Sequence, residues 1–194
     1  MKNYSLIVLA IIVWVGSVNA QKITIGGEFG VNSSRLTTDP DNFSSSARTG
    51  YQAGISMRLG NKVYLQPEFQ WAWMSSELSN PLDFGSPTSD NLNVHSFRVP
   101  VQLGFAVVNG KVGNVRIFTG PVMNFNFKAD NASSPVFNQE FKPFNVAARV
   151  GTGFDLWVLN VDLSYDIGVT DVFEGSDAKM RGFNAELGVA IPLK

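Results

Sequence analysis

Hydrophobic and polar residues alternate at every second position over most of the chain. In residues 161–170 all odd positions are apolar or aromatic, and all even positions are small or polar. Residues 182–193 repeat this alternation, from Phe183 to Leu193. Because successive side chains of a β-strand point to opposite faces, the pattern predicts strands with one apolar and one polar face.

The same alternation predicts six further strands, and no segment makes a convincing helix. The eight predicted strands cover residues 23–32, 51–59, 63–73, 96–107, 115–128, 144–155, 161–170 and 182–193. No linker and no shift in composition divides this part of the chain. We therefore predict a single all-β domain.

The predicted connections alternate between short and long. Short connections lie at residues 61–62, 109–114 and 157–159, and the second of these opens with an Asn-Gly hairpin signal. Long connections, rich in Ser, Asn, Asp and Pro, lie at residues 35–49, 77–93 and 129–142, and a connection of intermediate length lies at residues 171–179. This alternation is typical of an up-and-down meander whose turns gather at one end and whose exposed loops gather at the other.

Eight such strands leave two unpaired edges unless the sheet closes on itself. A membrane cannot satisfy open backbone groups, and about 9 to 11 residues per strand are enough to cross it at a tilt. We therefore predict an eight-stranded antiparallel up-and-down transmembrane β-barrel. Its even strand number would place both termini and the short turns on the periplasmic side, with the longer loops outside.

A soluble, lipocalin-like carrier with the apolar face inward is the alternative barrel. Its polar face would meet water and should be rich in Lys, Glu and Thr, whereas here it is rich in Gly, Ser, Asn and Gln. The Gly-x-Trp signature expected near the first strand of a lipocalin is also missing. Both features favour the membrane barrel.

Aromatic residues gather toward one end of the predicted apolar faces. In a membrane barrel this end would lie at the outer interface, where an aromatic girdle is expected. The predicted girdle consists of Tyr51, Trp71, Trp73, Phe97, Phe125, Phe127, Phe144 and Phe183.

Four prolines lie inside predicted strands, where each lacks the N–H group that an interior ladder position needs. They are Pro67, Pro100, Pro121 and Pro192. We expect them at bulges or strand ends.

The first twenty residues have the layout of a secretory signal. Lys2 precedes an almost uncharged apolar run, and small residues lie before the predicted cleavage between Ala20 and Gln21. The run is too short for a membrane-spanning helix, and no stop-transfer charges follow it. We therefore predict a signal peptide at residues 1–20 and a mature barrel domain at residues 21–194.

Composition excludes several kinds of function. The chain has no cysteine, which excludes disulfides, thiolate metal sites and a cysteine nucleophile. A single histidine disfavours zinc sites and a histidine-based triad. A formal net charge of −1 with no basic run argues against nucleic acid. We expect no metal and no cofactor.

The predicted inner face carries six acidic residues and four arginines. They are Glu28, Arg58, Glu68, Arg98, Arg116, Arg149, Asp155, Asp162, Asp166 and Glu186. An eight-stranded barrel is just wide enough for side chains to fill, so these charges should pair as a structural plug. The functional alternatives are a path for protons or ions, or an acid/base site made of paired carboxylates.

His95 is the one imidazole that could serve a catalytic serine, and Ser96 is its neighbour. Adjacent residues of a strand face opposite ways, so we expect His95 outside and Ser96 inside. This geometry argues against catalysis, and we predict that the protein is not an enzyme.

Three segments resemble the Bacteroidetes-type outer-membrane β-barrel family, the "porin family" or PorT-like proteins, with an architecture similar to small OmpA/OmpX-type barrels. They are residues 97–105 (FRVPVQLGF), 149–156 (RVGTGFDL) and 162–171 (DLSYDIGVTD). The resemblance covers the whole mature chain and includes no active-site residue. It implies an outer-membrane protein that contacts membrane lipid and, in transit, the assembly machinery.

The leading hypothesis is a non-enzymatic integral outer-membrane protein, structural or binding an unidentified protein or surface ligand through its extracellular loops. The resemblance suggests a second hypothesis, an accessory barrel of a secretion or assembly system. A third is a lipid A-modifying barrel enzyme.

Overall fold

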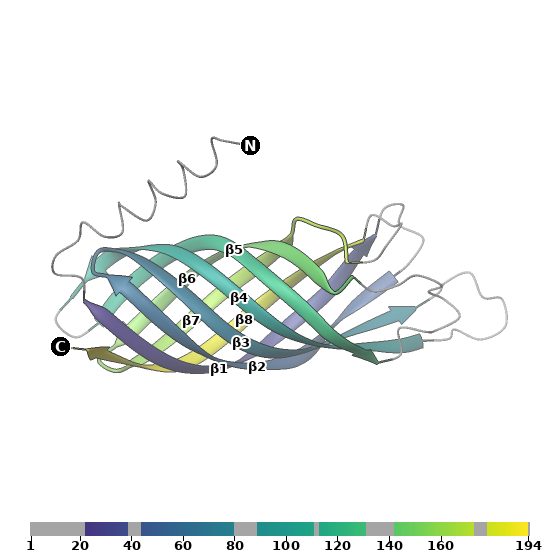
Figure 1. Cartoon of the computed structure of the whole chain (residues 1–194), viewed down its shortest axis with the longest axis horizontal. Coiled ribbons are helices and arrows are strands. Elements are labelled where there is room, and N and C mark those ends of the chain that lie inside the picture. The colour runs from purple at the N-terminus through teal and green to yellow at the C-terminus, as the bar shows by residue number, and fades with distance from the viewer. Residues whose placement is uncertain are drawn as a thin grey trace.

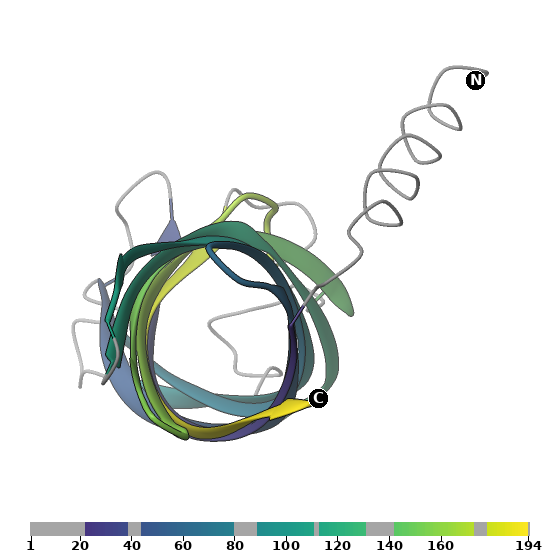
Figure 2. The same cartoon turned by 90° about the vertical axis from the view of Figure 1, so that its left-hand side faces the viewer.

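The structure is a computed structural model that describes residues 22–38, 44–79, 89–110, 113–130, 142–172 and 178–193. Within these ranges the chain forms a barrel of eight strands in sequence order, closed by pairing of the first strand with the last (Figures 1 and 2). The strands are β1 (Ile23–Thr38), β2 (Ser44–Gly60), β3 (Val63–Ser79), β4 (Ser89–Asn109), β5 (Gly113–Asp130), β6 (Phe144–Leu156), β7 (Leu159–Gly168) and β8 (Ala178–Leu193). The predicted cleavage site at Ala20 and Gln21 lies outside the described residues.

Every strand pairs antiparallel with its chain neighbours, which confirms the predicted eight-stranded antiparallel barrel. The turns after β2, β4 and β6 lie at the same end as Ile23 and Leu193, which pair with each other. We call this the short-turn end and the opposite one the long-connection end. No helix in the described ranges is long and apolar enough to cross a membrane.

Six of the strands, all but β6 and β7, extend further toward the long-connection end than the sequence pattern predicts. Much of the connection predicted at residues 35–49 is strand, because β1 ends at Thr38 and β2 begins at Ser44. Strand also covers both ends of the connection predicted at residues 77–93, because β3 ends at Ser79 and β4 begins at Ser89. Ladder hydrogen bonds join backbone groups and need no apolar side chains. Pairing therefore continues where the alternation has already faded.

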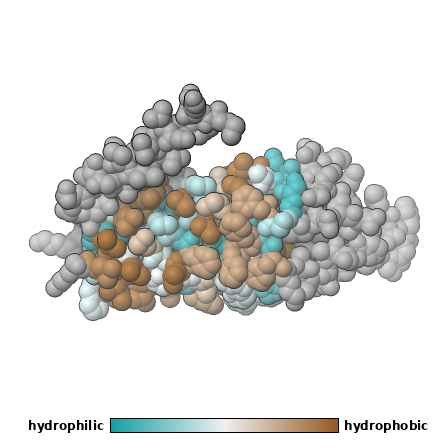
Figure 3. Space-filling view, in the orientation of Figure 1, coloured by the Kyte–Doolittle hydropathy of each residue, from teal (hydrophilic) through white to brown (hydrophobic). Residues whose placement is uncertain are grey.

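The two faces of the sheet have opposite chemistry. Large apolar side chains such as Phe29, Ile55 and Leu187 are exposed on the outer face, whereas polar side chains such as Gln66 and Gln70 are buried inside. Apolar residues cover much of the outer face that is in view in Figure 3. An apolar exterior around a polar interior is the arrangement of a membrane barrel and the reverse of a soluble carrier.

Three of the four strand prolines contradict the expectation of bulges or strand ends. The register is the same on both sides of Pro67 and Pro100 in the β3–β4 and β4–β5 ladders, and Pro121 lies in an unbroken β5–β6 register. Each proline removes one N–H donor, which does not require an extra residue. Pro192 is the penultimate residue of β8, as expected. The irregular registers lie elsewhere, near Ala47, His95 and Val108.

The β6–β7 turn is unusual because its first central residue is Trp157, with a φ of 57°. Two-residue hairpin turns of this kind normally place Gly, Asn or Asp at positive φ. In the β2–β3 turn Gly60 takes the positive φ. The sequence pattern predicts the β6–β7 connection at its correct place but gives no sign of this conformation.

Candidate functional site

All ten predicted interior charges project from the inner face of the barrel wall. Eight of them are buried, and the side chains of Arg58 and Asp155 are 14% and 13% exposed. They meet in three layers along the barrel axis, together with glutamines, asparagines and a tyrosine that share their face. These neutral residues were not predicted to belong to the interior network. Their alternation with apolar residues nevertheless places them on the inner face.

The mouth layer lies near the short-turn end and consists of Arg58, Tyr64, Arg116, Asp155 and Asp162. The Arg58 Nη1 atom lies 3.0 Å from one oxygen of Asp155, and the Arg116 Nη2 atom lies 2.9 Å from the other. Arg116 also pairs with Asp162 at 2.7 Å and donates a hydrogen bond to the Tyr64 hydroxyl at 3.0 Å. Two arginines thus balance two aspartates, and both guanidinium groups lie over the tyrosine ring, with 5.0 and 5.6 Å from Cζ to the ring centroid for Arg58 and Arg116.

The middle layer gathers three carboxylates, Glu28, Glu68 and Glu186, around the amide of Gln70. The Gln70 Nε2 atom lies 3.1, 3.0 and 2.7 Å from their oxygens, respectively. Gln66 and Gln102 donate to Glu68 at 2.7 and 2.6 Å. Amide donors therefore hold most of the acidic oxygens in place.

The far layer lies toward the long-connection end and centres on Asp166, which pairs with both Arg98 and Arg149. Asn184 donates to the same carboxylate at 3.0 Å. The Arg149 Nη1 atom also lies 3.7 Å from Glu68 and 3.8 Å from Glu186, so Arg149 links the far and middle layers. Its side chain is fully buried between the two.

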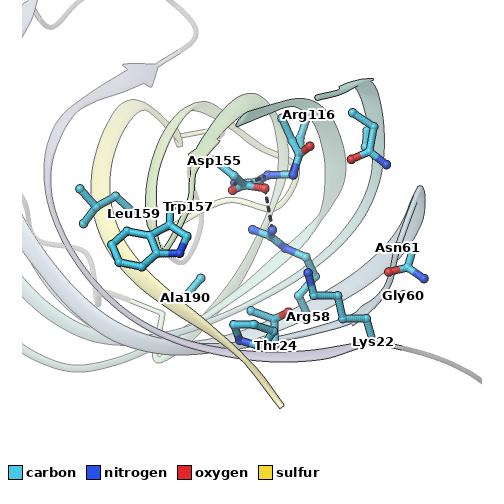
Figure 4. A pocket seen from close by; sticks show the side chains of 14 residues that line it. Lys22, Thr24, Arg58, Gly60, Asn61, Arg116, Asp155, Trp157, Leu159 and Ala190 are labelled. Atoms are coloured by element: carbon cyan, nitrogen blue, oxygen red, sulfur yellow. Dashed lines mark hydrogen bonds and ion pairs between the residues drawn. The ribbon is translucent and has the colours of Figure 1, made fainter. Parts of the chain in front are cut away.

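A cavity of about 350 Å³ opens beside the mouth layer at the short-turn end (Figure 4). Its lining includes Lys22, Arg58, Asn114, Asp155 and Trp157. At the long-connection end the hollow measures only about 20 Å³ and is lined partly by Met74 and Val172.

The eight predicted girdle residues all lie on the outer face, and seven of them are exposed, with Trp73 partly covered. Several stack on each other across strands: the ring centroids of Tyr51 and Trp73 are 5.8 Å apart, and those of Phe125 and Phe144 are 5.2 Å apart. Phe69, which was not assigned to the girdle, lies 5.4 Å from Phe97. Because the alternation already placed Phe69 on the apolar face, the sequence could have assigned it to the girdle.

His95 and Ser96 point to opposite faces of the sheet. The imidazole lies on the outside between the rings of Trp71 and Phe127, whereas Ser96 is completely buried inside. The two side chains therefore form no nucleophile–base pair. The structure also contains, over its described part, no group of three or more His, Cys, Asp or Glu side chains that could hold a metal ion.

Similarity to solved structures concerns the fold. OprG from Pseudomonas aeruginosa aligns with a TM-score of 0.58 and 12% identity over 90% of this chain and 96% of its own. Neisserial surface protein A (NspA) aligns with a TM-score of 0.55 and 11% identity over 88% of this chain and 97% of its own. None of the curated proteins compared with the chain matches it significantly.

One family model matches most of the sequence. The model described as "Outer membrane protein beta-barrel domain" covers residues 19–174. This match agrees with the closed barrel, its apolar exterior and its polar core. The chain therefore belongs to the family of outer membrane protein β-barrel domains.

Proposed function

We propose that this outer-membrane β-barrel is a non-enzymatic scaffold of the Bacteroidetes type, which binds a protein or surface ligand through its longer connections. In this proposal the signal peptide is removed after Ala20, and the short-turn end faces the periplasm. The longer connections then face the outside of the cell, where loops on a rigid support can bind partners.

The filled interior is the observation that carries the proposal. Three layers of paired and hydrogen-bonded side chains span the barrel between its two ends, and the fully buried Arg149 joins two of them. An eight-stranded barrel has room for such side chains but not for a water-filled channel as well. This favours a stiff support over a pore.

The separation of His95 and Ser96 supports a role without catalysis. A hydroxyl nucleophile needs a base within about 3.2 Å, and these two side chains lie on opposite sides of the barrel wall. The lipid A-modifying alternative would need another pair, and its test is the acylation of lipid A after expression. Unchanged acyl chains are expected.

Conductance across planar bilayers tests the closed scaffold. The mature protein, purified from outer membranes and shown to shift in gel mobility on boiling, should give no stepwise channels. The double variant E68A/R149A removes two side chains from the middle and far layers and serves as the control with a loosened interior. Only the folded fraction of this variant is measured. Discrete, ion-selective conductance in the unmodified protein would contradict the proposal.

The binding role depends on the connections and can be tested separately. Replacing residues 131–141 with a short Gly-Ser linker should leave the heat-dependent mobility shift intact, because the described pairing of β5 with β6 lies outside them. Any partner recovered with the unmodified barrel after detergent extraction should be lost. Recovery of the same partner with the shortened barrel would exclude this connection as its site.

A further inference from the structure

The cavity at the short-turn end has features that its structural role in the barrel does not explain. It measures about 350 Å³, within the size range of small-molecule sites, and it opens to solvent. In outer-membrane barrels the short turns face the periplasm. A ligand of this cavity would therefore come from the periplasmic side.

The cavity has an excess of positive charge. Among the described residues, Arg58 and Arg116 balance Asp155 and the deeper Asp162, and the ammonium group of Lys22 is an additional cation on the lining. Arg58 lies centrally in the opening (Figure 4). Its Nε donates to Gln66 at 2.7 Å and its Nη1 to Asp155 at 3.0 Å. Its Nη2 has no hydrogen-bond partner in the described part of the chain, so this nitrogen can donate to an anion.

Neutral amides supply a second kind of contact. Asn61, Asn109 and Asn114 all line the cavity. Asn61 and Asn109 are exposed, and their side-chain amides can both donate hydrogen bonds to a ligand hydroxyl and accept them from it.

Trp157 completes the rim opposite Asn61 (Figure 4). Trp157 is 93% exposed, although it occupies a turn position whose positive φ disfavours any residue with a Cβ atom. Glycine or asparagine would suit the turn better. Strain of this kind is found where a side chain has another role, and an indole offers a flat face for a ring.

We propose that this cavity binds a small carboxylate that carries a sugar ring. Arg58 and Lys22 hold the carboxylate, the amides of Asn61 and Asn109 bind hydroxyl groups, and Trp157 packs against the ring. This site is independent of the binding proposed for the longer connections, which lie at the opposite end of the barrel.

Fluorescence titration of the folded mature barrel in non-ionic detergent tests the site. The double variant W71F/W73F leaves Trp157 as the single tryptophan of the mature chain. D-glucuronate is the probe, with D-glucose as the ring without a carboxylate and acetate as the carboxylate without a ring. Only glucuronate should change the Trp157 emission in a saturable way, and added salt should weaken its binding.

Two further variants, R58Q and W157G, test the proposed contacts of the ligand with Arg58 and Trp157. Because W157G lacks the fluorescent indole, its binding is measured by calorimetric titration. R58Q should weaken glucuronate binding about tenfold or more through the lost charge-assisted contact. W157G should weaken binding while the barrel keeps its mobility shift on boiling. Equal affinity of R58Q, W157G and the unmodified barrel would overturn the proposal, as would equal binding of glucose or absence of binding.

A lipid contact of Trp157 is the competing outcome. In vesicles that contain brominated phosphatidylcholine, a tryptophan inserted in the bilayer interface is quenched by the lipid. The proposal expects weak quenching by this lipid and strong quenching by aqueous acrylamide, with protection from acrylamide by glucuronate. Strong quenching by the lipid without protection by glucuronate would overturn it.

Discussion

The two ends of the barrel interior differ in chemistry and in access. At the short-turn end charged side chains line a cavity of about 350 Å³, and the side chains of Arg58 and Asp155 keep some contact with solvent. At the long-connection end apolar side chains join the polar ones inside the barrel, and Val94 and Val172 are almost completely buried. The backbone N–H of Lys142 donates to the carbonyl of Val172 at 2.8 Å, which ties two connections together there.

This difference shows how one narrow barrel can combine an accessible site with a closed interior. Solvent at the mouth lowers the cost of charge, so ion pairs there tolerate an open cavity. Deeper charges have no such compensation and depend on direct partners. At the end that carries the longer connections, buried valines pack beside polar side chains, and the hollow measures only about 20 Å³. The ends should therefore respond differently to the same kind of substitution.

Removal of the deep guanidinium should have the largest effect. In R149M, Asp166 would lose one of its two arginine partners, and Glu68 and Glu186 would lose their nearest one. Breaking a buried pair by removing one partner costs about 3–5 kcal/mol. We expect this loss in the free energy of unfolding, measured in urea by gel mobility without boiling.

Two matched substitutions provide the comparison. R58M removes a guanidinium at the mouth, where solvent reaches Asp155, and R35M removes an exposed one on β1. The expected order of destabilisation is R149M, then R58M, then R35M. Equal losses in R149M and R58M would show that removing a guanidinium costs the same deep in the interior as at the mouth.

A charge on the outer face should destabilise the barrel according to its depth in the membrane. Leu187 and Ile191 are both exposed on the outside of β8, and Ile191 is close to the short-turn end. Leu187 lies about 15 Å from that end at a strand tilt of roughly 40°. L187R should therefore cost about 2–4 kcal/mol and I191R about 0–1 kcal/mol.

Unfolding in lipid vesicles measures both variants, and L187Q is the control for lost apolar surface alone. A larger loss for I191R than for L187R would mean that the bilayer centre lies nearer the short-turn end. It would also place the cavity mouth within the membrane rather than at its surface.

Packing at the long-connection end can be tested by shortening one buried valine, Val172. Val172 is 1% exposed and lines the small hollow with Met74 and Met180. V172A should lower the free energy of unfolding by about 1–3 kcal/mol, because it removes buried carbon and leaves a cavity. V169A, three residues away and exposed, is the matched control. Similar losses for both variants would show that Val172 does not close the interior.

The division between inner and outer faces could be predicted because it depends on period-two alternation alone. A shift of one residue would move every side chain to the other face, so a barrel between lipid and a polar core must keep the pattern strictly. This is why the positions of all ten charged residues followed from their parity. The same argument placed His95 outside and Ser96 inside.

The layers and the cavity could not be predicted, because they depend on register and strand tilt around the whole barrel. Arg116 and Tyr64 are 52 residues apart and meet only through two intervening ladders. Val172 lies in a connection without the alternation of a strand, and its burial depends on tertiary packing. The ends of the longer strands were missed because backbone pairing outlasts the side-chain pattern.

The backbone strain at Trp157, beside the cavity mouth, gives the smallest expected change in stability. Its φ of 57° costs about 1 kcal/mol for a residue with a Cβ atom, and glycine removes this cost. W157G and W157A both lose the indole, so the difference between them isolates the backbone strain. We expect W157G to unfold at a free energy about 1 kcal/mol higher than W157A, with both variants losing glucuronate binding. Equal stability of the two variants would mean that the turn is unstrained, and the conformation of Trp157 would then no longer support a binding role for its side chain.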